Sequence, residues 1–263
     1  GFLYLRMMNF MHTRSCFLAI IFSVSILGGC KKDEEEKPTP TPADTTGSVA
    51  FQVSNRIGNQ DLALGYLSYV NAAGDSFQVD LLKYYISGFE WKRADGTYFQ
   101  SKNYQLINAS QPTSLNFSLT GIPNGTYTGL RFYLGVDSLS NHTITNYAAL
   151  DASSGMIWSW NTGYIFFKHE GKFIDSNHVE KPLLFHYGTD RGFATVDLPL
   201  DNFVVNSDSR QLNLTFDLAT LYANPNMIDF NIWNNNQSLT TQEYPWLDAM
   251  KQNFSQSFSV HVP

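Results

Sequence analysis

Histidine is the side chain of this sequence best suited to bind a transition metal, because a neutral imidazole nitrogen is a good ligand for copper and zinc. The chain contains 6 His, and those beyond residue 30 are His142, His169, His178, His186 and His261. None of them belongs to an HxH or HxxxH motif, so spacing alone predicts no metal site. Each could instead be a strand histidine with a satisfied hydrogen bond. His186 and His261 could share one metal ion if their strands are neighbours.

Two tryptophans are the next candidates for chemistry. Trp158 and Trp160 flank Ser159, so in an extended strand both rings would point to one face. Such a pair could be plain core packing, a stacking platform for a sugar, or a redox-sensitive group beside a metal. Nearby, Lys168 and Glu170 are adequately explained as a surface ion pair.

The sequence lacks the catalytic motifs that have a fixed spacing. It holds no GxSxG elbow, HExxH helix, P-loop or CxxC pair. Carboxylates are plentiful, but nothing in their spacing selects the pair that a glycosidase uses. The formal net charge of -6 provides no attraction to nucleic acid. We therefore predict that the protein is not an enzyme and does not bind nucleic acid.

The N-terminal segment has the pattern of a secretion signal. The apolar run Cys16–Leu27 follows Arg14 and is well short of the ~20 residues that a membrane-spanning helix needs. It leads into Gly28, Gly29 and Cys30, which resemble a bacterial lipobox in which the Cys30 thiol takes the lipid. We predict a signal peptide over residues 1–29, with residues 1–6 upstream of the true start.

The residues after Cys30 predict a tether to a membrane. The stretch 30–46 combines a charged cluster with alternating Pro and Thr, which disfavours a helix and buries nothing. Its acidic cluster resembles the surface-export signal of Bacteroidetes lipoproteins. We expect a bacterial outer membrane lipoprotein, either periplasmic or surface-exposed, that contacts the membrane through its N-terminal lipid.

The folded part, residues 47–263, shows strand signals separated by turn signals. Aromatic residues make up 15% of the chain, and they pack well on pleated sheets. The run Val79–Trp91 predicts a long strand with a bulge at Gly88, followed by a hairpin turn at 94–97. A further strand is predicted over Ile157–His169.

Helical signals are confined to two short stretches, 218–222 and 245–254, the second with Pro245 in a first-turn position. About nine strands without alternating helices indicate an all-β fold. We predict a single antiparallel β-sandwich, immunoglobulin-like, with one or two short helices near the C-terminus.

Several segments, in order along the chain, resemble the MbnP-like family. The most specific is Gly155–Gly171 (GMIWSWNTGYIFFKHEG), which is similar to the family pattern GM-x-W-x-W-x-x-GYIF-x-K-x-EG. The others are Val79–Trp91 with the Asp95-Gly96 turn, Gly125–Asp137, Leu184–Gly188 (LFHYG) and Phe254–His261. The resemblance covers the chain from about Ser48 to the end.

The resemblance implies a secreted β-sandwich that binds copper, since the named member of the family is a periplasmic copper-binding protein associated with methanobactin gene clusters. It implies a histidine site: His186 falls on the family's HxG histidine, and His261 falls on or beside its C-terminal histidine. Some members carry another His in the first strand region, near Asn55 of this chain. In the named relatives a Trp is oxidised to kynurenine by a dihaem partner enzyme, so a dihaem peroxidase-like redox partner is expected.

Two hypotheses of different classes follow. The first is a lipid-anchored, non-enzymatic protein that binds copper through His186 and His261, with Trp158 or Trp160 as a redox-sensitive neighbour. The alternative is a surface-exposed module that binds a glycan or a protein and has no metal site. Converging histidines would favour the first hypothesis, and an outward-facing aromatic strip would favour the second.

Overall fold

The computed structural model describes residues 45–66, 69–143, 146–159 and 163–263. The strands are β1 (Thr46–Ile57), β2 (Gln60–Asp61), β3 (Tyr69–Val70), β4 (Ser76–Arg93), β5 (Tyr98–Asn108), β6 (Asn116–Pro123), β7 (Gly125–Leu134), β8 (Ile157–Ser159), β9 (Gly163–Ile174), β10 (Glu180–Gly188), β11 (Ala194–Val205), β12 (Ser209–Asp217), β13 (Asn235–Gln237) and β14 (Phe258–His261). The helices are α1 (Ser138–Asn141), α2 (Leu218–Leu221) and α3 (Tyr244–Phe254). None of the helices in these ranges has the length and apolar character to span a membrane.

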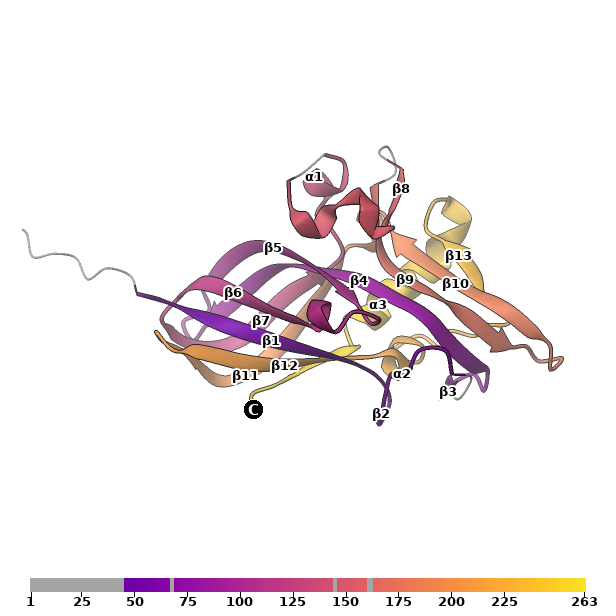
Figure 1. The fold of residues 1–263 in the computed structure, drawn as a ribbon, viewed down its shortest axis with the longest axis horizontal. Coiled ribbons are helices and arrows are strands. Elements are labelled where there is room, and N and C mark those ends of the chain that lie inside the picture. The colour runs from indigo at the N-terminus through magenta and orange to yellow at the C-terminus, as the bar shows by residue number, and fades with distance from the viewer. Residues whose placement is uncertain (1–44, 67–68, 144–145, 160–162) are drawn as a thin grey trace, which may run out of the picture. The chain divides into compact units, whose positions relative to one another are not determined.

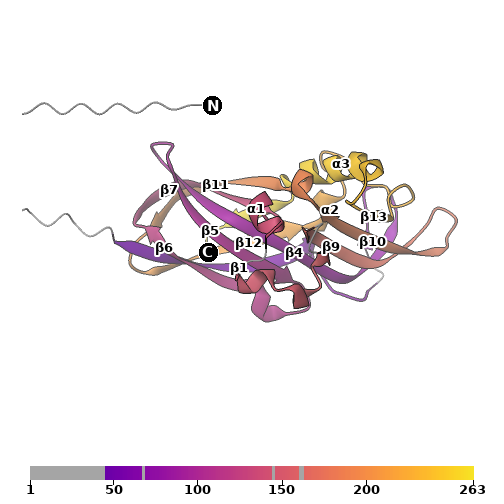
Figure 2. The same cartoon turned by 90° about the horizontal axis from the view of Figure 1, so that it is seen from above.

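The strands form two sheets (Figures 1 and 2). Sheet A has the order β14-β12-β1. Strands β2 and β6 both pair with the edge of β1 that faces away from β12. Sheet B has the order β11-β7-β4-β9-β10-β13, with β3 and β5 also paired to β4. The all-β sandwich is confirmed. The sheets are mixed rather than purely antiparallel, because β1 pairs with β12 and β10 pairs with β13 in parallel.

The 18-residue β4 is the central strand of sheet B. Tyr84 lies opposite Phe167 of β9, and Ile86 lies opposite Leu134 of β7. Both β4 residues also face β5, so β5 occupies one edge of β4 while β7 and β9 follow one another along the other edge. The chain therefore leaves the sheet after β7 and returns at β9. We call the intervening residues 135–159 the excursion; it carries α1 and β8 and stands over one side of sheet B (Figure 1).

Local predictions along β4 and near the C-terminus are confirmed. Gly88 has φ +61 and marks a register shift between β4 and β5, as expected for a bulge. The 94–97 turn joins β4 to β5, and the Asp95 carboxylate accepts the Thr97 N–H at 2.9 Å. The C-terminal helix α3 has Pro245 in its first turn.

One strand prediction is wrong. The run 157–169 is not a single strand, because β8 and β9 pair antiparallel as a hairpin, with Ile157 opposite Tyr164. Gly163 has φ +81, a conformation that glycine adopts without the strain of a side chain. The polar residues Ser159, Asn161 and Thr162 interrupt the apolar pattern ahead of Gly163, and the single-strand prediction treats this Asn-Thr-Gly turn signal as part of the strand. Trp160 lies outside the described residues, so the expected shared face of Trp158 and Trp160 stays a prediction.

The core between the two sheets is rich in aromatic side chains. Trp91 is fully buried, with ring centroids 5.7 Å from Tyr127, 6.2 Å from Phe51 and 6.2 Å from Phe203. Rings at these separations add roughly 0.5–1.5 kcal/mol per pair beyond the burial of their area. This aromatic packing fixes the two sheets face to face.

Helices pack against the core face of sheet B at β9 and β10. Trp246 of α3 lies 5.3 Å from Phe185, and Phe254 lies 4.9 Å from Tyr187, centroid to centroid. Phe185 and Tyr187 alternate along β10 with the less buried His186. One face of β10 is therefore in the core, and His186 points to the outer face of sheet B.

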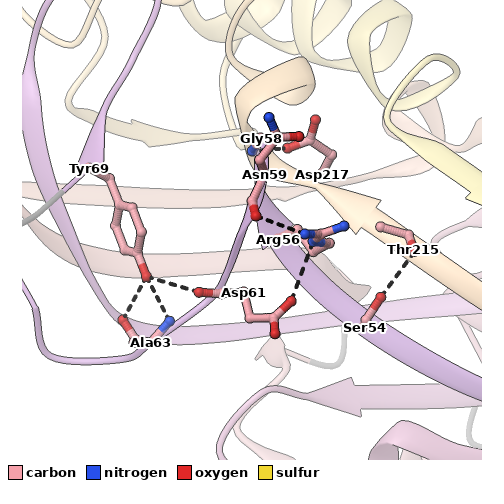
Figure 3. A network of polar contacts seen from close by, with 9 residues as sticks. All are labelled: Ser54, Arg56, Gly58, Asn59, Asp61, Ala63, Tyr69, Thr215 and Asp217. Atoms are coloured by element: carbon pink, nitrogen blue, oxygen red, sulfur yellow. Dashed lines mark hydrogen bonds and ion pairs between the residues drawn. The ribbon is translucent and has the colours of Figure 1, made fainter.

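Asp217 ties sheet A to the first helix that follows it. Its side chain accepts the Ala219 N–H at 2.9 Å as the N-cap of α2, and it accepts the Gly58 N–H at 2.8 Å. Beside it, the Ser54 and Thr215 hydroxyls of the parallel β1–β12 pair are hydrogen-bonded at 3.0 Å (Figure 3). This network holds the turn after β1 against the end of β12.

Candidate metal site

The two histidines expected to share a metal ion lie on different sheets. His186 is on β10 of sheet B and points to that sheet's outer face. His261 is on β14 of sheet A, opposite Asn213, and is exposed. Phe258 of the same strand is buried, so His261 points away from the core on the other side of the sandwich. The fold therefore does not bring His186 and His261 together.

His186 instead forms a cluster with two side chains of β9. Its Nε2 lies 2.9 Å from Glu170 Oε1, and the Lys168 ammonium lies 3.1 Å from the same oxygen. Lys168 is directly opposite His186 in the register, and Glu170 is the next outward-facing residue along β9. The ion pair expected between Lys168 and Glu170 is confirmed. The side chains of His186 and Lys168 are only 17% and 18% exposed, so water screens their interactions less than on an open surface.

The surroundings set the protonation of this cluster. Burial lowers the pKa of His186 and outweighs the hydrogen bond to Glu170, which favours the charged ring. Burial alone would raise the pKa of Glu170, but hydrogen bonds from His186 and Lys168 outweigh it and lower that pKa. At neutral pH the cluster thus holds a neutral imidazole and an ionised carboxylate. The Nε2–H group donates to Glu170, so a cation held by Nε2 and Glu170 Oε1 together would have to replace that proton.

Trp158 contacts β10 at Gly188, two residues beyond His186. A Cβ built on Gly188 would come within 2.6 Å of the Trp158 ring and 2.6 Å of the Tyr164 carbonyl oxygen. The Trp158 ring therefore rests directly on the backbone at Gly188. Its Nε1 is buried and has no hydrogen-bond partner among the described residues. Trp158 and Gly188 belong to two of the segments that resemble the family.

A strained turn directly after Gly188 holds the excursion in place. Thr189 has φ +65, which is rare for a β-branched residue. This turn directs Asp190 to the excursion, where its carboxylate accepts hydrogen bonds from Ser138, from Asn141 Nδ2 at 2.8 Å and from His142 Nε2 at 3.1 Å. Strained backbone of this kind is often found at functional sites.

Comparison with known protein families places the chain. The MbnP family profile matches residues 46–242. The chain belongs to the MbnP family. A solved structure of MbnP from Methylosinus trichosporium superposes with a TM-score of 0.54 at 17% sequence identity, covering 83% of this chain and 99% of that one. At this identity the superposition shows a shared fold. No curated protein sequence matches the chain.

The remaining histidines of this MbnP family member are placed differently. His169 is fully buried in the core, where its Nδ1 lies 2.6 Å from the Tyr222 hydroxyl oxygen. His142 interacts with Asp190, as described above. His178 occupies a turn with φ +61. Asn55, near the position where some family members have a His, is buried and accepts a hydrogen bond from the Tyr84 hydroxyl at 2.8 Å.

The donors of the MbnP fold in this chain fit a metal only in part. The described ranges contain no group of three or more His, Cys, Asp or Glu side chains positioned to hold a metal ion. His186 and Glu170 supply one nitrogen and one oxygen donor, a combination that suits Cu(II) or Zn(II). A carboxylate that orients the imidazole is also typical of protein metal sites. The pair thus forms a partial coordination site on the outer face of sheet B.

No signal in the sequence predicts the role of Asp190. It lies two residues after the HYG motif, but its partners lie far away in sequence, in α1 and the residue after it. Only the return of the chain from the excursion brings them together. The side chain of Cys30, the predicted lipid attachment site, lies outside the described residues.

Replacing Thr189 with Gly is expected to stabilise the protein. Relief of a positive φ is worth roughly 1–3 kcal/mol, and the added freedom of glycine in the unfolded chain costs roughly 0.5–1 kcal/mol. We expect a net gain of about 1 kcal/mol in the free energy of unfolding, measured in urea. Thr195→Gly is the matched control, because Thr195 is an exposed residue of β11 without positive φ and its loss should destabilise. Equal destabilisation by both substitutions would contradict the strain at Thr189.

Proposed function

We propose that this MbnP family member is a lipid-anchored, non-enzymatic protein of the cell envelope that binds copper on the outer face of sheet B. His186 and Glu170 are the proposed protein donors. The observation that carries the proposal is the neutral His186 imidazole, held by Glu170 through one nitrogen and lying beside Trp158. The resemblance of HYG to the family's HxG segment supports the same residue.

The chemistry of the cluster predicts modest affinity. The two donors are a borderline nitrogen and a hard oxygen, which favour Cu(II) over Cu(I). The Lys168 ammonium binds the same carboxylate oxygen and must be displaced or must share that oxygen when a cation binds. We propose that water or a partner molecule completes the coordination.

Replacing His186 with Asn is expected to abolish copper binding. The test is copper content by mass spectrometry of the full chain, purified from copper-supplemented periplasm, and again after reconstitution with Cu(II). About one copper per chain is expected in the wild type, and loss of most of it in His186→Asn, because the oriented nitrogen is removed. Glu170→Gln should weaken binding without removing it.

His261→Asn is the matched control, because His261 is an exposed strand histidine on the other sheet. It should keep the wild-type copper content. Two results would sink the proposal: a wild type that binds no copper after reconstitution, or equal copper content in His186→Asn and the wild type. Loss of copper in His261→Asn would instead favour a site that joins two molecules.

The envelope location and the partner remain proposals of the same kind. A lipid on Cys30 would raise the intact mass of the mature chain by that of a diacylglyceryl and acyl group, and Cys30→Ser should release the protein into the soluble fraction.

A dihaem peroxidase-like partner would oxidise a Trp, and Trp158 is the proposed site because its ring lies beside the copper donors. A mass increase on the peptide that contains Trp158 would support this role.

A further inference from the structure

A polar groove lies on the outer face of sheet B, on strands adjacent to those of the proposed copper donors, with its Lys83 opposite Lys168 in the β4–β9 register. It has a volume of about 630 Å³, within the range of small-molecule sites. Strands β4 and β5 form its floor, with Lys83, Leu106 and Asn108 among the lining residues. The excursion forms its wall, through Tyr147 and Asp151. The groove thus exists because the chain leaves the sheet between β7 and β9.

The wall carries an exposed aromatic ring that is fixed in position by a second ring. Tyr147 is 40% exposed, and its ring lies 4.7 Å from that of Tyr104 in an edge-to-face arrangement. The Tyr104 hydroxyl is itself fixed by hydrogen bonds to Asp137 and to Ser140, the latter at 2.7 Å. An exposed ring whose orientation is fixed can bind an apolar C–H face with little loss of side-chain entropy.

The floor and rim supply fixed hydrogen-bonding groups. The Asn108 Oδ1 accepts from the Ser110 hydroxyl at 2.8 Å, which orients the amide and leaves its Nδ2 as a donor to the groove. The Asp151 Oδ1 accepts the Ser153 N–H at 2.7 Å, which leaves its second oxygen as an acceptor. Gln111 adds an exposed amide at the rim. Donors and acceptors therefore surround an aromatic ring and the apolar Leu106.

The charges of the groove exclude a strongly ionic ligand. Lys83 and Asp151 are the charged side chains among its lining residues, and they are of opposite sign. The Lys83 ammonium is also bound to the Ser154 carbonyl oxygen at 2.8 Å, which fixes it in the floor. A phosphate polymer or polyanion would gain no net attraction there. An uncharged ligand rich in hydroxyl groups, with one apolar face, matches the lining best.

We propose that this groove binds a neutral oligosaccharide, with a sugar ring stacked on Tyr147 and its hydroxyls hydrogen-bonded to Asn108 and Asp151. This function is independent of the copper site, since none of the groove residues belongs to the His186 cluster. It also differs from a glycan platform formed by Trp158 and Trp160, because Trp158 rests on Gly188 instead of lining the groove.

The test uses the full chain on an array of neutral and acidic oligosaccharides, followed by calorimetric titration with the neutral hexasaccharide that gives the highest signal. Tyr147→Ala should weaken binding about tenfold, the effect of losing a stacking contact. Tyr147→Phe keeps the ring and should retain binding. Asp151→Asn keeps the Ser153 contact but removes the ionised acceptor, and should weaken binding several-fold.

Tyr66→Ala is the control, because Tyr66 is 65% exposed and does not line the groove. It should bind like the wild type, and all variants should share its thermal midpoint within a few degrees. The proposal is overturned if no neutral oligosaccharide binds, if only acidic ones bind, or if Tyr147→Ala and Tyr147→Phe bind equally. Copper content should be unchanged in Tyr147→Ala, which separates this proposal from that for His186.

Discussion

Replacing Gly188 with Ala is expected to lower the free energy of unfolding by about 3 kcal/mol, near the upper end of the usual cost of overpacking. The added methyl would meet the Trp158 ring and the Tyr164 carbonyl oxygen, each at 2.6 Å. The backbone of β9 cannot retreat easily here, because Tyr164 pairs with β8 and the adjacent Ile165 pairs with Gly188 of β10. Trp158 must therefore leave its position. Urea unfolding measures the loss, and Trp fluorescence should report greater exposure of an indole.

Gly129→Ala is the matched control for this substitution. Gly129 is also a strand glycine, but a Cβ there would meet only ordinary contacts at 3.5 Å or more, and its φ is not positive. Alanine at 129 should leave stability unchanged or raise it slightly, because it restricts the unfolded chain. If both variants unfold at the same urea concentration, Trp158 does not rest on Gly188 as described.

Acidification from pH 6.5 towards pH 4 is expected to destabilise the protein by about 3 kcal/mol through His169 alone. Burial lowers the pKa of His169 to about 4, so the folded state holds it neutral. In the unfolded chain the pKa is about 6.5, so the unfolded state binds more protons between these values. The stabilisation is complete above pH 6.5 and is lost as the pH falls towards 4. Thermal unfolding at intervals of pH would measure the slope.

His169→Gln should reduce this slope, and what remains is expected from His186, whose pKa burial also lowers. Gln does not titrate and can still bond the Tyr222 hydroxyl, so a general loss of stability would not be mistaken for a pH effect. Glu170 and Asp137 have lowered pKa values, so their contributions are lost only below their ordinary range, near or below pH 4.5. A wild-type slope between pH 5 and 6.5 in His169→Gln would contradict the assignment.

The sequence predicted those parts of the fold that local chemistry determines. The Gly88 bulge, the 94–97 turn and helix α3 each have a signal within a few residues: a glycine, an Asp-Gly pair, and a proline before spaced apolar residues. The parallel β1–β12 pairing has no such signal, because its partners are far apart in sequence. Strand alternation indicates which face is buried but not which strand lies alongside.

The residues of the candidate site could be predicted from the sequence, but their arrangement in space could not. His186 and Trp158 both stood out in the sequence, yet their neighbourhood depends on the β8–β9 hairpin, whose turn signal the single-strand prediction treats as part of the strand. His261 shares the strand pattern of His186, and no local property distinguishes one sheet from the other. Asp190 has no motif of its own, and its role arises only from the partners that the excursion brings to it.

The parallel pairing of β1 with β12 also constrains when the protein can fold. Ser54 and Thr215, which share a hydrogen bond across this pair, are 161 residues apart. Closing so long a loop is entropically costly, and contacts of this kind slow folding to milliseconds or longer. Strand β6 is made much earlier and pairs with β1 on its other edge, so a β1–β6 ribbon can form first. The central pair of sheet A must then wait until β12 is also available after the proposed export, and until that moment β1 has an open edge.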